Sequence, residues 1–126
     1  MGDKIRTKVA IVEDDATMLS LLQTLMEYEG FEVLNVDLGK NIDLVVDALR
    51  REMPDLLLLD VFLDQYDGFE LLRELRGDHV FDSTRILVSS GRELSRECAQ
   101  EGADGFILKP YMPEDLIKNI HRILGK

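Results

Sequence analysis

The sequence predicts a doubly wound α/β domain, in which one five-stranded parallel sheet carries helices on both faces. Two observations support this fold class. Five short apolar runs recur along the chain, and the segments between them carry apolar residues at helical spacing. Uniformly apolar runs are typical of parallel strands that are buried on both faces. Because βαβ crossovers are right-handed, they place helices on both sides of such a sheet, so we interpret the 126 residues as a (βα)5 sandwich in a single domain.

The first half of the chain contains two predicted strand–helix units. Lys8–Val12 is the first strand, and the helix after it is marked by residues at positions i, i+3, i+4 and i+7, namely Met18, Leu21, Leu22 and Leu25. We expect Gly30 to end this helix, because glycine relieves the strain of a left-handed C-terminal residue. The second strand is Glu32–Val36, and the helical spacing then recurs in Ile42, Val45, Val46 and Leu49.

The second half repeats the alternation three times. Pro54-Asp55 introduces the third strand, Leu56–Val61, and the helix after it is marked by Phe69, Leu72 and Leu75. We expect Gly77 to end this helix in the same left-handed way as Gly30. The remaining elements are the strand Arg85–Ser89, a weaker helix around Leu94 and Cys98, the strand Gly105–Leu108, and a last helix with Pro113 in its first turn and Leu116, Ile120 and Ile123 on one face.

Composition excludes several classes of protein. The chain has 15 Lys and Arg against 25 Asp and Glu, a net charge of −10, which argues against binding to a nucleic-acid backbone. One cysteine, Cys98, cannot close an intrachain disulfide. Apolar runs such as Leu56–Leu59 are far shorter than the roughly 20 residues that span a bilayer. We therefore expect a cytoplasmic domain that binds neither nucleic acid nor a membrane.

Acidic, hydroxyl and basic side chains follow four of the five predicted strands. They are Glu13-Asp14-Asp15 after the first strand, Asp60 at the third, Ser89-Ser90 at the fourth and Lys109-Pro110 at the fifth, whereas the second strand ends near Asp37 with nothing comparable. In open parallel sheets the binding crevice lies outside the carboxyl ends of the strands. We therefore expect these side chains to meet at one edge of the sheet.

Three converging carboxylates, from Glu13, Asp14 and Asp60, would repel one another without a cation. Mg²⁺ suits such a site because it prefers a few carboxylates together with water and phosphate oxygens. Asp60 follows four leucines, and an aspartate in that setting can act as a nucleophile towards phosphorus. Lys109 would then supply a second positive charge to the phosphoryl group, and Ser89 a hydroxyl donor.

These motifs together resemble the receiver domain of two-component response regulators, which has a flavodoxin-like fold. The motifs are Val12-Glu13-Asp14-Asp15, Asp60 with Asp67-Gly68 downstream, Ser89-Ser90, and Gly105-Phe106-Ile107-Leu108-Lys109-Pro110. The resemblance covers roughly residues 7 to 125, so we treat residues 1–126 as one receiver domain with its core at about 7–125.

The resemblance implies a role for each residue of the site. Glu13 and Asp14 are the acidic pair that binds Mg²⁺ (or Mn²⁺), together with Asp60 and the backbone carbonyl of Phe62. Asp60 is also the phospho-acceptor, and Lys109 contacts the phosphoryl group. The resemblance also implies that the Lys109–Pro110 peptide bond is cis. The family commonly has proline four residues after the acceptor, where this chain has Asp64. We expect that departure to alter the loop geometry and the metal affinity.

The resemblance also implies partners and a switch. The phosphoryl donor would be a sensor histidine kinase or a phosphotransfer protein. Ser89 is the switch hydroxyl and Phe106 the switch aromatic: Ser89 would reach towards the phosphoryl oxygens, Gly91 would absorb the backbone change, and the Phe106 ring would turn inward. The altered surface would be the fourth helix, fifth strand and fifth helix, where an effector or a second copy of the chain would dock.

Other interpretations of the same residues stay open from the sequence alone. Glu13-Asp14-Asp15 could cap a helix, Ser89 could bond its own backbone, and Phe106 could be core. The chain could be a degenerate receiver that acts as an unphosphorylated adaptor, although the intact set of acids argues against this. A phosphohydrolase with an aspartyl nucleophile would need a second acid where the chain has Phe62. We therefore expect no enzyme activity beyond self-phosphorylation from small donors and weak autodephosphorylation.

Overall fold

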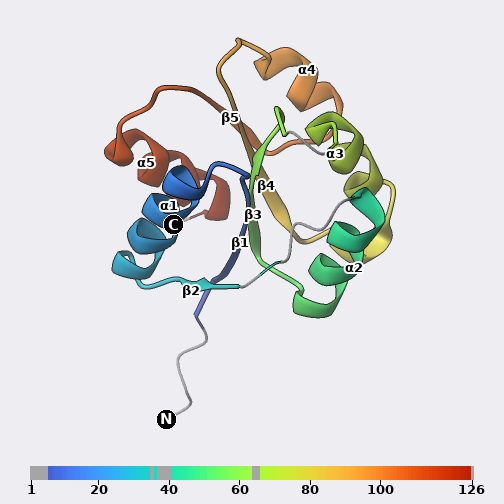
Figure 1. Cartoon of the computed structure of the whole chain (residues 1–126), viewed down its shortest axis with the longest axis horizontal. Coiled ribbons are helices and arrows are strands. Elements are labelled where there is room, and N and C mark those ends of the chain that lie inside the picture. Colours follow the sequence, from blue (N-terminus) through green and yellow to red (C-terminus); the bar gives the residue numbers. More distant parts are fainter. Residues whose placement is uncertain (1–5, 35, 37–40, 64–65, 126) are drawn as a thin grey trace.

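Five parallel strands in the order β2-β1-β3-β4-β5 form the centre of the molecule (Figure 1). The computed structural model describes residues 6–34, 36, 41–63 and 66–125. The strands are β1 (Lys8–Val12), β2 (Glu32–Val33), β3 (Leu56–Asp60), β4 (Arg85–Ser90) and β5 (Gly105–Leu108). The predicted doubly wound α/β fold is confirmed.

Helices cover both faces of this sheet. They are α1 (Ala16–Tyr28), α2 (Ile42–Glu52), α3 (Gly68–Arg76), α4 (Ser95–Gln100) and α5 (Pro113–Leu124), and a short 3₁₀ helix, η1 (His79–Phe81), follows α3. Helices α1 and α5 lie on one face, and α2, α3 and α4 lie on the other (Figure 1). Pro113 begins α5, as predicted, because a first-turn proline has no N–H that the helix needs.

The sheet separates two apolar cores, and β3 supplies both. All five residues of β3 are buried. Leu57 and Leu59 belong to the core under α2, α3 and α4, whereas Leu56 and Leu58 belong to the core under α1 and α5. Side chains alternate across a strand, so a strand that is covered on both faces needs apolar residues at every position. This explains the four consecutive leucines.

The register of the strands brings their carboxyl ends together. Val12 at the end of β1 pairs with Leu59, one residue before Asp60, and Asp60 pairs with Ser89 on β4. Ser89 pairs in turn with Ile107 on β5, two residues before Lys109. The acidic, hydroxyl and basic side chains of the predicted site therefore share one edge of the sheet.

Three details differ from the sequence-based predictions. Leu21, part of the predicted apolar stripe of α1, is 62% exposed, because Leu22 and Met26 provide the buried pair of that helix. Gly77 does not adopt the left-handed conformation: its φ is −82°, and the chain turns directly into η1. Besides Gly30, left-handed residues follow three helices for which none was predicted: Met53 (φ 48°) after α2, Gly102 (φ 95°) after α4 and Gly125 (φ 75°) after α5.

The remaining element bounds agree closely with the predictions. β3 ends one residue earlier and β4 one residue later than expected. β2 is shorter than predicted and stops at Val33, while Asp37 lies outside the described residues. Gly30 has the expected positive φ of 90°. Among the described residues, no helix is both long and apolar enough to cross a bilayer.

Candidate functional site

The three acids after β1 have different surroundings. Asp15 is the N-cap of α1, and its carboxylate accepts a 2.9 Å hydrogen bond from the Met18 amide. Glu13 is buried, and its Oε2 accepts a 3.1 Å bond from the Asp15 amide. Asp14 is exposed at the mouth of the site. The helix-cap interpretation therefore holds for Asp15 alone.

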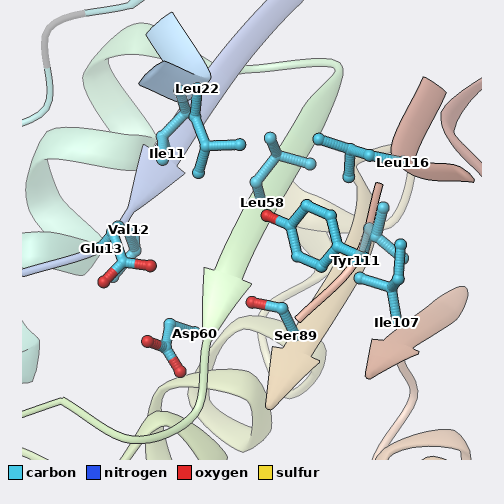
Figure 2. Close-up of a pocket in the computed structure, with 11 residues that line it drawn as sticks. Ile11, Val12, Glu13, Leu22, Leu58, Asp60, Ser89, Ile107, Tyr111 and Leu116 are labelled. Atoms are coloured by element: carbon cyan, nitrogen blue, oxygen red, sulfur yellow. The ribbon is translucent and has the colours of Figure 1, made fainter. Parts of the chain in front are cut away.

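Asp60 ends the buried strand β3 with only 7% of its surface exposed. Its Oδ1 accepts a 3.0 Å hydrogen bond from the Phe62 amide, and its Oδ2 accepts a 3.0 Å bond from Lys109 Nζ. One carboxylate oxygen from each of Glu13, Asp14 and Asp60 lies within 4.8 Å of the others. Figure 2 shows Glu13 and Asp60 at the same end of neighbouring strands. The structure thus brings together the three predicted acids.

Lys109 links the two buried acids. Its Nζ lies 3.0 Å from Asp60 Oδ2 and 3.1 Å from Glu13 Oε1, and the preceding β5 positions it there. Burial favours the neutral amine, but the hydrogen bonds to Asp60 and Glu13 outweigh burial and raise the pKa of Lys109. The Lys109–Pro110 peptide bond is cis, as expected.

The charges in the site do not balance. Burial raises the pKa of Glu13 and outweighs the Asp15 amide and the Lys109 ammonium, both of which favour the carboxylate. The cluster has three carboxylates, from Glu13, Asp14 and Asp60, whereas Lys109 contributes a single positive charge. The ionised cluster therefore carries excess negative charge. Clustered oxygen ligands with unbalanced negative charge fit a hard divalent cation such as Mg²⁺.

The loop after Asp60 closes against α3. Gly68 begins α3, and its amide donates a 3.0 Å hydrogen bond to the Val61 carbonyl. A Cβ at Gly68 would lie 2.4 Å from Val61 Cα, so only glycine allows this approach. Phe62 and Asp67 form an antiparallel bridge across the loop. Asp64, the expected departure in this loop, lies outside the described residues.

The predicted switch residues lie on different sides of the sheet. Ser89 lines a small cavity of about 10 Å³ together with Asp60, Glu13 and Tyr111 (Figure 2). Phe106 packs instead against the core under α2, α3 and α4, so it does not line that cavity. The interpretation of a strand-end hydroxyl that bonds local backbone applies to Ser90, whose Oγ accepts a 2.9 Å bond from the Arg92 amide.

Two tyrosines of the site were missed in the sequence. Tyr111 lines the cavity, and burial raises the pKa of its phenol. Tyr66 is half-buried, and burial followed by the negative charge of Asp14 raises its pKa to about 12. Tyr111 stands two residues after Lys109, a position that could have marked it as part of the site.

The cysteine and the histidines are neither in the acid cluster nor among the residues that line the cavity. Cys98 is buried in α4, and burial followed by the charges of Glu97 and Glu93 raises the pKa of its thiol to about 11. A buried thiol with a raised pKa is unreactive. His79 and His121 lie at the surface.

Comparison with known proteins identifies the family. A family model, described as the response regulator receiver domain, matches residues 9–121. The chain belongs to this family. Relatives include the transcriptional regulatory protein CpxR of Escherichia coli (strain K12), 37% identical over 121 residues that cover 94% of this chain and 50% of CpxR. Another is the transcriptional regulatory protein CreB of the same strain, 32% identical over 122 residues that cover 96% of this chain and 52% of CreB.

Solved receiver structures share the fold. The beryllofluoride-activated N-terminal receiver domain of Klebsiella pneumoniae RstA superposes with a TM-score of 0.80 at 27% identity, and the match covers 94% of this chain and 99% of that one. The N-terminal domain of the nisin resistance regulator NsrR gives a TM-score of 0.81 at 31% identity, over 95% and 99% of the two chains. This receiver has a phospho-acceptor signalling role, and it spans about half the length of the curated relatives it matches.

Proposed function

We propose that this receiver accepts one phosphoryl group on Asp60 from a histidine kinase or a phosphotransfer protein. The observation that carries the proposal is the setting of Asp60. Its carboxylate ends a buried strand, is oriented by the Phe62 amide and Lys109, and clusters with Glu13 and Asp14. A carboxylate held this way is restricted to one orientation before the donor arrives.

The transfer itself needs no base. An Asp60 carboxylate oxygen forms a bond to phosphorus, the phosphorus–nitrogen bond to the donor imidazole breaks, and its electron pair stays on that nitrogen. Lys109 already touches Asp60 at 3.0 Å, so a small movement carries its ammonium to the new phosphoryl oxygens. The Lys109 ammonium thus offsets the negative charge of the phosphoryl oxygens as the acyl phosphate forms.

Glu13, Asp14, Asp60 and the Phe62 carbonyl are the ligands that would hold Mg²⁺ or Mn²⁺ in this proposal. When bound, the ion supplies positive charge that offsets the charge of the incoming phosphoryl group. Support comes from the excess negative charge of the cluster and from the raised pKa of Glu13, which burial causes.

We further propose that Ser89 transmits the signal. Ser89 pairs with Asp60 across the sheet, so its hydroxyl is available to a phosphoryl group there. Gly91 follows in an exposed loop where a Cβ would meet nothing within 4 Å, which leaves room for backbone movement. Phe106 pairs with Val88, next to Ser89, and would turn inward as the loop moves. The surface of α4, β5 and α5 would then dock an effector or a second copy of the chain.

The donor is proposed to dock beside α1. A groove of about 460 Å³ runs between α1 and the start of α5, and Tyr111 and Leu22 line both this groove and the cavity beside Asp60. The α1 sequence carries no charge before Glu27, although 32% of the chain is charged, and Leu21 is 62% exposed on it. A donor that presents its histidine to Asp60 must cover this neighbouring surface, so we infer that it does so with apolar side chains.

The same proposal makes residues 1–126 a single receiver domain, with its core at about 7–125, that works in the cytoplasm as a signalling module. Its own chemistry would be limited to self-phosphorylation from small donors and slow loss of the phosphoryl group. An unphosphorylated adaptor would not need the ordered Asp60, Lys109 and Glu13 contacts.

Intact-mass measurement after incubation with acetyl phosphate and Mg²⁺ tests the proposal. We expect the mass of one phosphoryl group on the wild type, none on Asp60→Asn, and none when EDTA removes the metal. Asp55→Asn is the matched control, because Asp55 precedes the same strand at its opposite end and is exposed. Phosphorylated Asp60→Asn, or a reaction that EDTA leaves unchanged, contradicts the assignment.

A further inference from the structure

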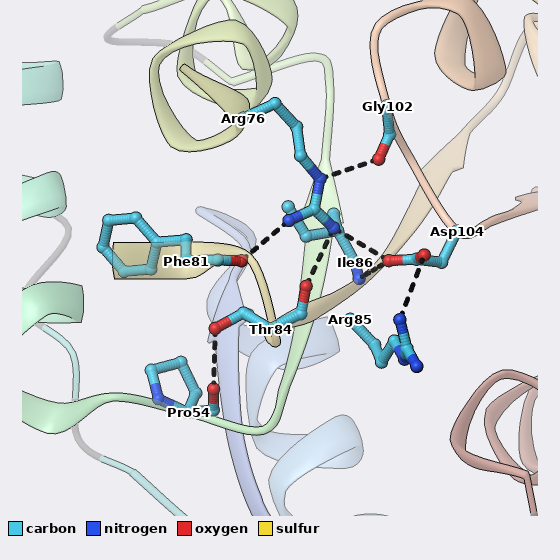
Figure 3. A network of polar contacts seen from close by, with 8 residues as sticks. All are labelled: Pro54, Arg76, Phe81, Thr84, Arg85, Ile86, Gly102 and Asp104. Atoms are coloured by element: carbon cyan, nitrogen blue, oxygen red, sulfur yellow. Dashed lines mark hydrogen bonds and ion pairs between the residues drawn. The ribbon is translucent and has the colours of Figure 1, made fainter. Parts of the chain in front are cut away.

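Arg76 at the end of α3 ties together several segments (Figure 3). These segments lie before β4 and β5, at the opposite end of the strands from the acidic site. Its Nε donates to the Gly102 carbonyl at 2.8 Å, and its two terminal nitrogens donate to the carbonyls of Phe81 at 2.9 Å and Thr84 at 2.8 Å. The guanidinium also forms a 2.8 Å ion pair with Asp104. One side chain therefore joins α3, η1, the turn before β4 and the turn between α4 and β5.

The partners of Arg76 are themselves anchored. The Asp104 carboxylate oxygen that meets Arg76 also accepts a 2.8 Å hydrogen bond from the Ile86 amide, near the start of β4. Thr84 is buried, and its hydroxyl donates to the Pro54 carbonyl before β3. Only 20% of the Arg76 side chain is exposed, so solvent screens these charge-assisted bonds less than it screens a surface pair.

The bonds of Arg76 to Gly102, Phe81, Thr84 and Asp104, which we call the Arg76 clamp, hold the C-terminal end of α4. Gly102 donates its amide to the Ala99 carbonyl while its own carbonyl accepts from Arg76. A Cβ at Gly102 would lie 2.7 Å from Arg76 Cγ, so the turn packs directly on the arginine stem. Ala103 donates to the Cys98 carbonyl, and Cys98 is fully buried. The last turn of α4 is thus fixed by packing and by hydrogen bonds.

The N-terminal end of α4 is attached mainly through local contacts. Its N-cap residue, Leu94, provides no side-chain hydrogen bond to the helix but packs, partly buried, against the core under α2, α3 and α4, and the exposed Glu93 accepts a 2.8 Å hydrogen bond from the Ser95 amide. The helix has six residues, of which only Cys98 is buried. A 2.9 Å bond from the Arg92 amide to Ser90 Oγ attaches the loop to the end of β4. A movement that starts at Ser89 would therefore be opposed here mainly by hydrogen bonds within residues 90–95 and by the packing of Leu94.

We propose that Arg76 is a positioning residue that makes the C-terminal end of α4 a fixed pivot. When Asp60 is phosphorylated, the N-terminal end of α4 moves with the loop after Ser89, while the turn at Gly102–Asp104 stays in place. The inference rests on the proposed function, because the phosphoryl group on Asp60 drives the motion. Without the clamp, the displacement would spread into the turn and into the start of β5.

Hydrogen exchange at two amides, measured by NMR with and without beryllofluoride and Mg²⁺, tests the pivot. The Cys98 amide bonds to the Leu94 carbonyl in the first turn of α4, and the Ala103 amide bonds to the Cys98 carbonyl at its end. In the wild type we expect beryllofluoride to change exchange at Cys98 by on the order of tenfold and at Ala103 by less than about twofold. In Arg76→Gln we expect a change on the order of tenfold at both amides.

Arg73→Gln is the matched control. Arg73 lies one turn earlier on α3 and reaches the same end of α4 through a single 3.5 Å ion pair with Glu101, with half of its side chain exposed. This variant should respond like the wild type. If Arg76→Gln does not fold, Asp104→Asn is the second variant. It removes the ion pair with Arg76 and a longer 3.9 Å pair with the half-exposed Arg85 but keeps an acceptor for the Ile86 amide, and beryllofluoride should again change exchange at both Cys98 and Ala103.

The outcomes are separable. Equal changes at Cys98 and Ala103 in the wild type overturn the pivot, and a response confined to Cys98 in Arg76→Gln and Asp104→Asn overturns the role of the clamp. A wild type that takes no phosphoryl mass and shows no amide change anywhere overturns the proposed function and this inference with it. That result is recognisable because the acceptor loop, including the Phe62 amide, would also be silent.

Discussion

Replacing Lys109 with methionine should destabilise the protein in the absence of a divalent metal. The Lys109 ammonium is the cation that contacts both buried acids, and only 23% of the side chain is exposed. Methionine keeps much of the apolar stem but removes the charge. Asp60 and Glu13 would then face each other with no ammonium between them.

The structure sets the size of the effect. At 3.0 and 3.1 Å, each contact of Nζ with a carboxylate is worth about 5 kcal/mol at an effective dielectric constant near 20. Removing the ammonium from water opposes this by several kcal/mol, and breaking one side of a buried pair typically costs about 3 kcal/mol. We therefore expect the free energy of unfolding to fall by about 3 kcal/mol and the Tm by about 10 °C.

Urea unfolding in EDTA, compared with unfolding in Mg²⁺, is the assay. Lys118→Met on the exposed surface of α5 is the matched control and should change the free energy of unfolding by less than about 0.5 kcal/mol. Mg²⁺ should stabilise Lys109→Met more than it stabilises the wild type, because the ion replaces the missing positive charge. A variant as stable as the wild type in EDTA, or equal stabilisation of both by Mg²⁺, would show that the Lys109 ammonium does not offset the charges of Asp60 and Glu13.

Two further predictions follow from the same site and from the α1 groove. Because burial raises the pKa of Glu13 in the folded state, Glu13 contributes stability below its unfolded pKa of about 4.3 and loses it as pH rises through the folded pKa. In urea unfolding measured from pH 4 to 8 in EDTA, the free energy of unfolding of Glu13→Gln should therefore lack the decrease with rising pH that Glu13 causes in the wild type. A variant with the same pH profile as the wild type would contradict this prediction. Leu21→Ser should slow phosphotransfer from a histidine-phosphorylated partner by about tenfold but leave the reaction with acetyl phosphate unchanged. Leu44→Ser, at an apolar residue that is 52% exposed on α2, is its control, and equal slowing in both variants would place the donor elsewhere.

The sequence was sufficient for the fold and for the position of the acids, because both depend on simple periodic rules. Uniformly apolar runs identify strands that are covered on both faces, and parallel strands bring their carboxyl ends to one edge. Glu13, Asp60 and Lys109 are far apart along the chain, yet each directly ends or follows a strand. The sequence therefore predicts that these three side chains meet, but it does not predict the distances of about 3 Å between them.

The errors arose where the outcome depends on packing between segments. Helical spacing marks a stripe but not its width, so the sequence does not show that Met26, rather than Leu21, completes the buried face of α1. A glycine after a helix permits a left-handed turn without requiring one, as Gly77 shows. Arg76 looks like an ordinary basic residue in the last turn of a helix, since its partners are set by loops that fold against it.

The pairing of the first and last helices on one face of the sheet has a consequence for synthesis of the chain. Leu22 and Met26 of α1 are made early, but Leu116 and Ile120 of α5, which share their core, emerge from the ribosome almost one hundred residues later. The other face, with α2, α3 and α4, is complete before then. The part of this face that α5 covers therefore stays exposed during translation, and a nascent chain arrested before Pro113 would expose apolar surface that chaperones and proteases recognise.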